Sequence, residues 1–271
     1  MDWNRARNIL IVTFIIIDLL LIGGILINYG PVSSVRRDRE QEQTMSMLKA
    51  AGIEVDTKIP GETPSMSLLR VELYDYNSKN LIGRILAGGY SEEISGDEHV
   101  YRTLTEAITV APNGDLHYKS MVPLTFNVSV EEGLLNFLTS KGMAEPGMYI
   151  ESTVKQGNSY IVKIAHQVDG HFLDISYIQA KIGPHNVEII KHWLNPEGYL
   201  PQKKKVIPAY KALDSFISSA NAVDKTKIKD IDLGYYFRWD EAASGEAVPA
   251  WRITTGDDVY YFNAYTGVPE R

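Results

Sequence analysis

The sequence predicts an α+β protein, in which a single N-terminal transmembrane helix carries an extracytoplasmic domain of two helix-plus-antiparallel-sheet units. The first observation is an apolar run over residues 9–27, interrupted by one charged-type residue, Asp18. At about 1.5 Å per residue, a helix of this length crosses a hydrocarbon core of about 30 Å. The second is a helical pattern followed by strand and turn patterns, which occurs twice. The third is the scarcity of crossover helices between long strands, which favours antiparallel sheets over a doubly wound parallel sheet.

The apolar run is expected to stay in the mature protein. It is longer than the core of a secretory signal, and no pair of small residues spaced for cleavage follows it. Arg5 and Arg7 precede it, which favours a cytoplasmic N-terminus. We therefore expect a single-pass protein of the cell membrane, with a cytoplasmic tail over residues 1–8, a transmembrane helix over residues 9–29 and the remaining chain outside the cytoplasm.

The predicted membrane helix has two distinctive faces. At 100° per residue, small and hydroxyl side chains gather on one face, and Asp18 lies on another. An aspartate at the bilayer centre costs roughly 2.5–3.5 kcal/mol on insertion scales, so such a group usually faces a partner. The alternative is a protonated aspartate that a single anchor tolerates. We predict that the partner-binding residues are Thr13, Phe14, Ile17, Asp18 and Gly24.

A polar juxtamembrane helix is expected over residues 30–52. Met45 and Leu48 form a short apolar stripe on it, and Gly52 stands where a helix C-cap is favoured. This helix would be either a simple stalk or a rigid lever between domain and anchor.

Two α+β regions are expected to follow, over residues 53–142 and residues 143–271. The Asn113-Gly114 and Asp169-Gly170 pairs are hairpin-turn signals. The expected helices cover residues 78–86, 130–140 and 207–220. The expected strands cover residues 53–55, 100–110, 116–121, 148–155, 159–167, 171–181, 186–193, 227–239, 250–255 and 259–264.

Composition and motifs give little support for enzymatic chemistry. The formal charge of −7 without an evident basic face argues against nucleic acid, and the absence of cysteine excludes disulfides and thiolate chemistry. Phosphate-binding, nucleophile-elbow and zinc-protease motifs are absent from the sequence. If Asp169-Gly170 forms a two-residue turn, His166 and His171 share one sheet face. No third ligand stands nearby, so exposed strand histidines are the favoured interpretation, and we predict no catalytic residue, metal or cofactor.

The two ends of the chain resemble the YycI (WalI) family of Gram-positive bacteria. The opening residues 1–9, MDWNRARNI, run straight into one apolar helix, and residues 48–55 read LKAAGIEV before a proline-bearing loop. The closing segment resembles that family and also a PepSY-type ending. It contains LGYY over residues 233–236, PAWRI over residues 249–253 and YYFNAYTG over residues 260–267.

The resemblance implies a domain of YycH/PepSY-like fold and a non-enzymatic regulatory subunit. Members of the family act with the sensor histidine kinase YycG (WalK) and the sister protein YycH, and this two-component system controls cell-wall metabolism. The implied partners are therefore YycG, YycH and the membrane, with no nucleic acid and no known small-molecule substrate. The alternatives are a membrane-anchored cell-wall enzyme and a PepSY-like binding or inhibitory module.

Overall fold

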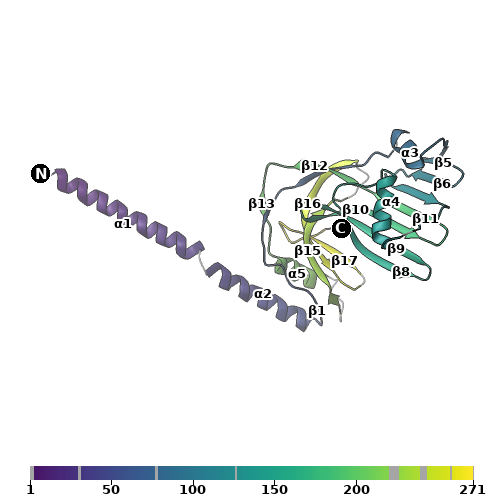
Figure 1. Ribbon diagram of the computed structural model, residues 1–271. Coiled ribbons are helices and arrows are strands. Elements are labelled where there is room, and N and C mark those ends of the chain that lie inside the picture. Colours follow the sequence, from purple (N-terminus) through teal and green to yellow (C-terminus); the bar gives the residue numbers. More distant parts are fainter. Residues whose placement is uncertain are drawn as a thin grey trace.

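Two helices lead into a mixed α+β globular part (Figure 1). The computed structural model describes residues 3–29, 32–76, 79–125, 127–219, 226–238, 243–256 and 258–270. Across these residues, no helix combines the length and the apolar character that crossing a membrane requires. The described helices are α1 (Trp3–Tyr29), α2 (Val32–Ala50), α3 (Lys79–Leu86), α4 (Val130–Ser140) and α5 (Ala209–Ser218).

Local signals place the helix ends where the sequence predicts them. The hydroxyl of Ser129 caps α4 by accepting a hydrogen bond from the Glu132 amide. After α2, Gly52 adopts a φ of +73°, and the Ile53 amide donates to the Leu48 carbonyl at 2.9 Å. This is the left-handed C-cap that glycine favours. The predicted helix residues Ser78 and Ala220, and the predicted strand residue Trp239, lie outside the described part of the chain.

Most strands join one large sheet, whose central path runs β12-β3-β16-β15-β10-β11-β7-β6-β5-β4. Strands β8 and β9 extend it from β10, and β17 and β18 extend it from β16. The described strands are β1 (Glu54–Val55), β2 (Ser65–Met66), β3 (Leu69–Leu73), β4 (Ser91–Ser95), β5 (Glu98–Arg102), β6 (Glu106–Val110), β7 (Leu116–Ser120), β8 (Met148–Gln156), β9 (Ser159–Val168), β10 (His171–Ile182), β11 (Val187–His192), β12 (Leu194–Tyr199), β13 (Lys204–Lys205), β14 (Lys227–Ile228), β15 (Asp230–Tyr236), β16 (Ser244–Thr254), β17 (Val259–Asn263) and β18 (Pro269–Glu270).

Two hydrophobic clusters form the core. One contains side chains of α2, α5, β3 and β15–β17, and the other contains side chains of α3, α4, β5–β7 and β9–β11. The first draws mainly on the chain before Tyr74 and after Trp193, together with Leu173 of β10, whereas the second draws on the stretch from Tyr76 to Trp193. The domain boundary proposed at residue 142 stays a prediction.

The clusters meet where β10 changes its neighbour. Phe172 and Leu173 pair in parallel with β15, the ladder is irregular between Leu173 and Tyr177, and the rest of β10 pairs with β11. Within this irregularity Ile175 has a φ of +59°, a strained conformation for a β-branched residue. The expectation of purely antiparallel pairing is therefore wrong at this junction, and also at the short pair β1–β14.

Two predicted strands are each two strands in the structure, and one of them, over residues 227–239, contains β14 and β15. Residues 100–110 are divided between β5 and β6, because Thr103 organises a tight turn between them. Its hydroxyl accepts hydrogen bonds from the amides of Thr105 and Glu106, and its own amide donates to the Glu106 carbonyl. The Asp169-Gly170 hairpin is confirmed, with Val168 opposite His171 and His166 opposite Leu173.

Candidate functional site

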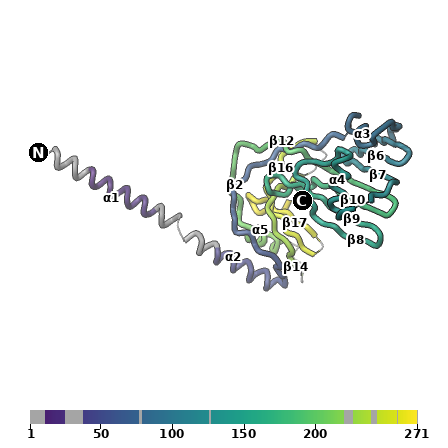
Figure 2. The backbone as a smooth tube through the Cα atoms, in the orientation of Figure 1, coloured from purple at the N-terminus to yellow at the C-terminus, as the bar shows by residue number. Residues whose placement is uncertain are grey.

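The C-terminal half of α2 is part of the globular core. Leu48 is 1% exposed and belongs to the first hydrophobic cluster, together with residues of α5 and the sheet. Helix α5 and strand β14 lie at the base of α2 (Figure 2). The C-terminal half of α2 is therefore attached to the domain, and whether α2 is a simple stalk or a rigid lever stays a prediction.

Polar contacts fix the same junction. Thr44 is 2% exposed, and its hydroxyl donates to a carboxylate oxygen of Asp214 in α5 at 2.7 Å. One turn earlier, the hydroxyl of Tyr210 donates to Glu40 at 2.6 Å. Hydrogen bonds to charged groups are among the stronger ones, so these two contacts hold α2 in one orientation on α5.

The five residues predicted to bind a partner all lie on α1. Thr13, Phe14, Ile17, Asp18 and Gly24 are exposed, and the large side chains of Phe14 and Ile17 are 61% and 47% accessible. A Cβ built on Gly24 would meet no heavy atom within 4 Å among the residues described. These residues thus lie on an outer surface of the helical arm, the name used here for α1 and α2 together. Their role stays a prediction.

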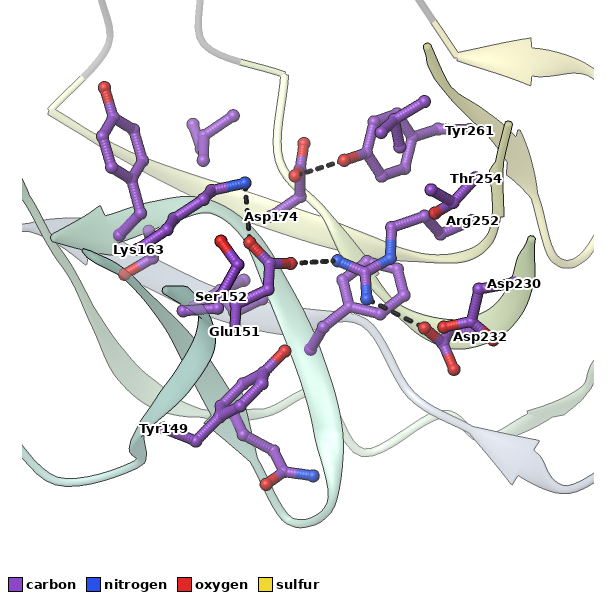
Figure 3. A pocket seen from close by; sticks show the side chains of 18 of the residues that line it. Tyr149, Glu151, Ser152, Lys163, Asp174, Asp230, Asp232, Arg252, Thr254 and Tyr261 are labelled. Carbon is purple, nitrogen blue, oxygen red and sulfur yellow. Dashed lines mark hydrogen bonds and ion pairs between the residues drawn. The ribbon is translucent and has the colours of Figure 1, made fainter. Parts of the chain in front are cut away.

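The globular part has a large open cleft of about 1290 Å³ beside the junction of β10 and β15. Strands β8–β10 form one side, and β15–β17 form the other (Figure 3). Alternation along β15 explains its polar lining, because Ile231 faces the core while Asp230 and Asp232 line the cleft. The cleft is therefore the face of this curved sheet opposite the hydrophobic core.

Arg252 joins the two sides of this cleft. Its guanidinium lies 2.8 Å from Asp232 of β15 and 3.3 Å from Glu151 of β8, and it stacks over Phe172 at 4.3 Å from the ring centroid. Glu151 also pairs with Lys163 at 2.7 Å. Burial disfavours the charged guanidinium, but the hydrogen bond and charge of Asp232 outweigh it and raise the pKa of Arg252.

Two further carboxylates of the cleft, Asp174 and Asp230, have no ion pair with the residues that the structure describes. Asp174 accepts a hydrogen bond from the Tyr261 hydroxyl at 2.5 Å, and Asp230 stands beside Asp232. Burial raises the pKa of Asp174, and burial together with the neighbouring Asp232 raises the pKa of Asp230. The cleft is lined by four carboxylates, Glu151, Asp174, Asp230 and Asp232, and by three cations, Lys163, Lys229 and Arg252, so one carboxylate is in excess.

Neither Glu151 nor Arg252 is a predicted site residue. The alternating polar residues of β15 and β16 show one polar face, but the sequence offers no sign that β8 lies opposite. His166 and His171 do lie on the predicted hairpin, yet they have different partners: His166 contacts Ser176, and His171 contacts the Leu233 carbonyl. In the described parts of the chain, no group of three potential ligands stands ready for a metal ion.

These features define a class of protein, an α+β domain carried on a helical arm. A family model described as YycI protein matches residues 33–265, and the chain therefore belongs to the YycI family. Membership indicates a regulatory rather than an enzymatic protein, with a role in the YycFG two-component system. No curated protein matches the chain.

Two solved structures resemble the chain. An uncharacterized protein from Eubacterium rectale ATCC 33656 shares 10% identity and a TM-score of 0.53, with 81% of this chain and 91% of that chain covered. This likeness concerns the fold alone. The Bacillus megaterium YpeB C-terminal domain shares 15% identity and a TM-score of 0.38, with 74% of this chain and 96% of that chain covered.

Proposed function

We propose that this chain is a membrane-anchored, non-enzymatic regulatory subunit that binds the sensor histidine kinase YycG and the sister protein YycH. The observation that carries the proposal is the family match over residues 33–265. The consequence is control of the two-component system, and through it of cell-wall metabolism.

The proposed anchor is the apolar run over residues 9–29, with its N-terminus in the cytoplasm and the domain outside. Asp18 supports a contact between helices, because a carboxyl group is costly in lipid and less costly against a polar partner. Gly24 and Thr13 support close approach of a second helix on a different face. A chain that contacts two membrane partners has a use for two such faces.

The proposed mechanism is a shift in the populations of kinase conformations. Such a shift requires different affinities for the two states, and a rigid arm provides a means of distinguishing them. Helix α2 packs into the core through Leu48 and is hydrogen-bonded to α5 through Thr44. We therefore expect a displacement of the domain to be transmitted to α2. We assign the domain's partner contact to the open cleft, whose acidic groups complement a basic surface.

The experiment that tests this function is affinity purification of the tagged full-length chain from its native membranes. The wild type is compared with Asp18→Leu and with Leu19→Ile as a matched control, and mass spectrometry identifies the co-purified proteins. We expect YycG and YycH with the wild type and with Leu19→Ile, and a loss of at least one of them with Asp18→Leu.

Other outcomes are equally informative. If both partners remain with Asp18→Leu, the membrane contact lies elsewhere on the helix or in the domain. If neither YycG nor YycH appears with the wild type, the proposed function is wrong. Alkaline extraction of the same membranes tests the anchor, because an integral protein stays in the pellet and a peripheral one is released.

A further inference from the structure

A second, smaller pocket of about 320 Å³, which shares Gln167 with the large cleft, lies between the loop before β8 and the start of β12. Pro146 and Gly147 form one side, Pro196 forms another, and Asp169 lies at its edge. His166 and Trp193 also line it, although they are only 2% and 1% exposed. Two almost completely buried rings therefore border the pocket.

The position of His166 is tightly determined. Its ring stacks on Trp193, with the ring centroids 4.1 Å apart, and its Nδ1 lies 2.9 Å from the Ser176 hydroxyl. A Cβ on Gly147 would lie 3.1 Å from Nε2 and 2.3 Å from the Gln167 carbonyl oxygen. Glycine at this position, with a φ of +77°, therefore leaves space next to Nε2.

The hydrogen bonds of Ser176 favour one tautomer of His166. The Ser176 hydroxyl accepts from the Leu194 amide at 3.0 Å, and within the described residues His166 Nδ1 is the acceptor within reach of its hydrogen, so we infer that the hydroxyl donates to Nδ1. Burial lowers the pKa of His166 to about 4, so the ring is neutral at pH 7. With Nδ1 acting as acceptor, the single proton lies on Nε2.

This N–H has no acceptor among the residues that the structure describes. Because the His166 ring borders the pocket, a ligand that brings an acceptor to Nε2 gains a hydrogen bond there. The Asp169 carboxylate at the pocket edge disfavours an anionic acceptor. The prolines offer apolar surface for a methyl group or ring. A neutral carbonyl oxygen next to a small apolar group meets all of these conditions.

We propose that this pocket binds a neutral amide, whose carbonyl oxygen accepts a hydrogen bond from His166 Nε2–H. Two kinds of molecule present this group, an acetylated peptide and an N-acetylated sugar. The inference does not depend on the proposed kinase contact, because it rests only on His166, its partners and the space beside Gly147.

The test is NMR of the full-length chain in lipid nanodiscs, with ¹⁵N-labelled histidine. Long-range ¹H–¹⁵N spectra of the free protein report the tautomer of His166. The probes are N-acetyl-alanine methylamide for the peptide and N-acetylglucosamine for the sugar, and glucose serves as the control without an amide. We expect the Nε2–H tautomer and a shift of the His166 Nε2 signal with at least one amide probe, but not with glucose.

Two variants complete the experiment. His166→Phe keeps a ring on Trp193 and removes the donor, so binding of the active probe should weaken about tenfold, the value of one hydrogen bond. His171→Phe changes the other histidine of the same hairpin and should bind as the wild type does. The proposal is overturned by an Nδ1–H tautomer, by equal shifts with glucose, or by the absence of any shift with both amides. The wild-type spectra decide these points even if a variant fails to fold.

Discussion

His166 and Lys191 show how neighbouring groups determine the charge state of a buried titratable side chain. Both side chains are 2% exposed. Lys191 lies 2.6 Å from Glu145 and donates to the Met143 carbonyl at 2.9 Å, so its charge is balanced although burial lowers its pKa. His166 contacts only the neutral Ser176 and an aromatic ring, and burial alone holds its pKa low. The lysine can therefore stay charged in the core, whereas the histidine stays neutral.

This difference predicts a pH dependence of stability. The folded pKa of His166 is about 4, below the value of about 6.5 in an unfolded chain. Between these values only the unfolded chain takes up the proton, so stability falls as the pH falls. We expect the free energy of unfolding of the wild type, relative to His166→Phe, to fall by about 3 kcal/mol between pH 7 and pH 4. Urea unfolding of both proteins at several pH values measures this, and parallel profiles would contradict the assignment.

At the scale of single elements, one apolar side chain of α2 enters the hydrophobic core. Leu48 is the α2 side chain inserted into the first hydrophobic cluster, whereas Met47 next to it is 49% exposed. The same helix therefore presents one residue to the core and its neighbour to solvent. This distribution gives a matched pair of substitutions.

We expect Leu48→Ala to lower the free energy of unfolding by about 3 kcal/mol, because it leaves a cavity in a packed core. Amide hydrogen exchange in the C-terminal half of α2 should rise with it, since this helix loses its attachment. The control Met47→Ala should change stability by less than about 0.5 kcal/mol. Unchanged exchange in α2 after Leu48→Ala would show that Thr44 and Glu40 alone hold the arm.

The junction of β10 and β15 depends on a close approach of two strands. A Cβ on Gly234 would lie 2.4 Å from the Phe172 ring and 2.5 Å from its carbonyl oxygen. We expect Gly234→Ala to cost at least about 2 kcal/mol, because the strands must separate to make room. A Cβ at the control position Gly89 would meet no described heavy atom within 4 Å, so Gly89→Ala should hardly change the free energy of unfolding. Chemical unfolding measures the stability of both variants. Equal free energies of unfolding for Gly234→Ala and Gly89→Ala would mean that β10 and β15 can move apart without loss of stability.

At the scale of the whole molecule, the arm and the globular part have separate roles in the proposed function. The two hydrophobic clusters and the sheet make up the globular part, and Leu48 of α2 packs into it. The proposed membrane contacts lie on α1, away from this part (Figure 1). Neither part alone would then be sufficient for regulation.

Exchange of residues 9–29 for an unrelated apolar helix tests this separation. We expect the chain to fold and reach the membrane, and regulation of the YycFG system to be lost, because the specific helix faces are gone. A reporter of the response regulator measures the output, and a thermal melt checks that the domain is folded. Full regulation after the exchange would instead assign the function to the domain.

Local features were predictable from the sequence. The helix over residues 130–140 carries its own N-cap, Ser129, and the Asp169-Gly170 turn sets the pairing of His166 with Leu173. These signals act between residues a few positions apart, so neighbouring side chains and backbone conformation are sufficient to specify them. The turn at Thr103 was missed, because its hydroxyl contacts lie within a run that reads as one continuous strand.

Only the tertiary structure decided which distant strands meet. Arg252 contacts Glu151 across the cleft, 101 positions away in the chain, and β10 pairs in parallel with β15. The pocket of His166 likewise depends on Trp193, which another strand pairing brings beneath the ring. The alternation of polar and apolar residues along one strand is compatible with many different strand partners. The partners are selected by the burial of the two apolar clusters at the same time. The sequence by itself therefore determined most helices, the long strands between residues 148 and 192 and the turn between β9 and β10, whereas strands such as β3, β4 and β12, the cleft, the pocket and the junction were decided by long-range packing.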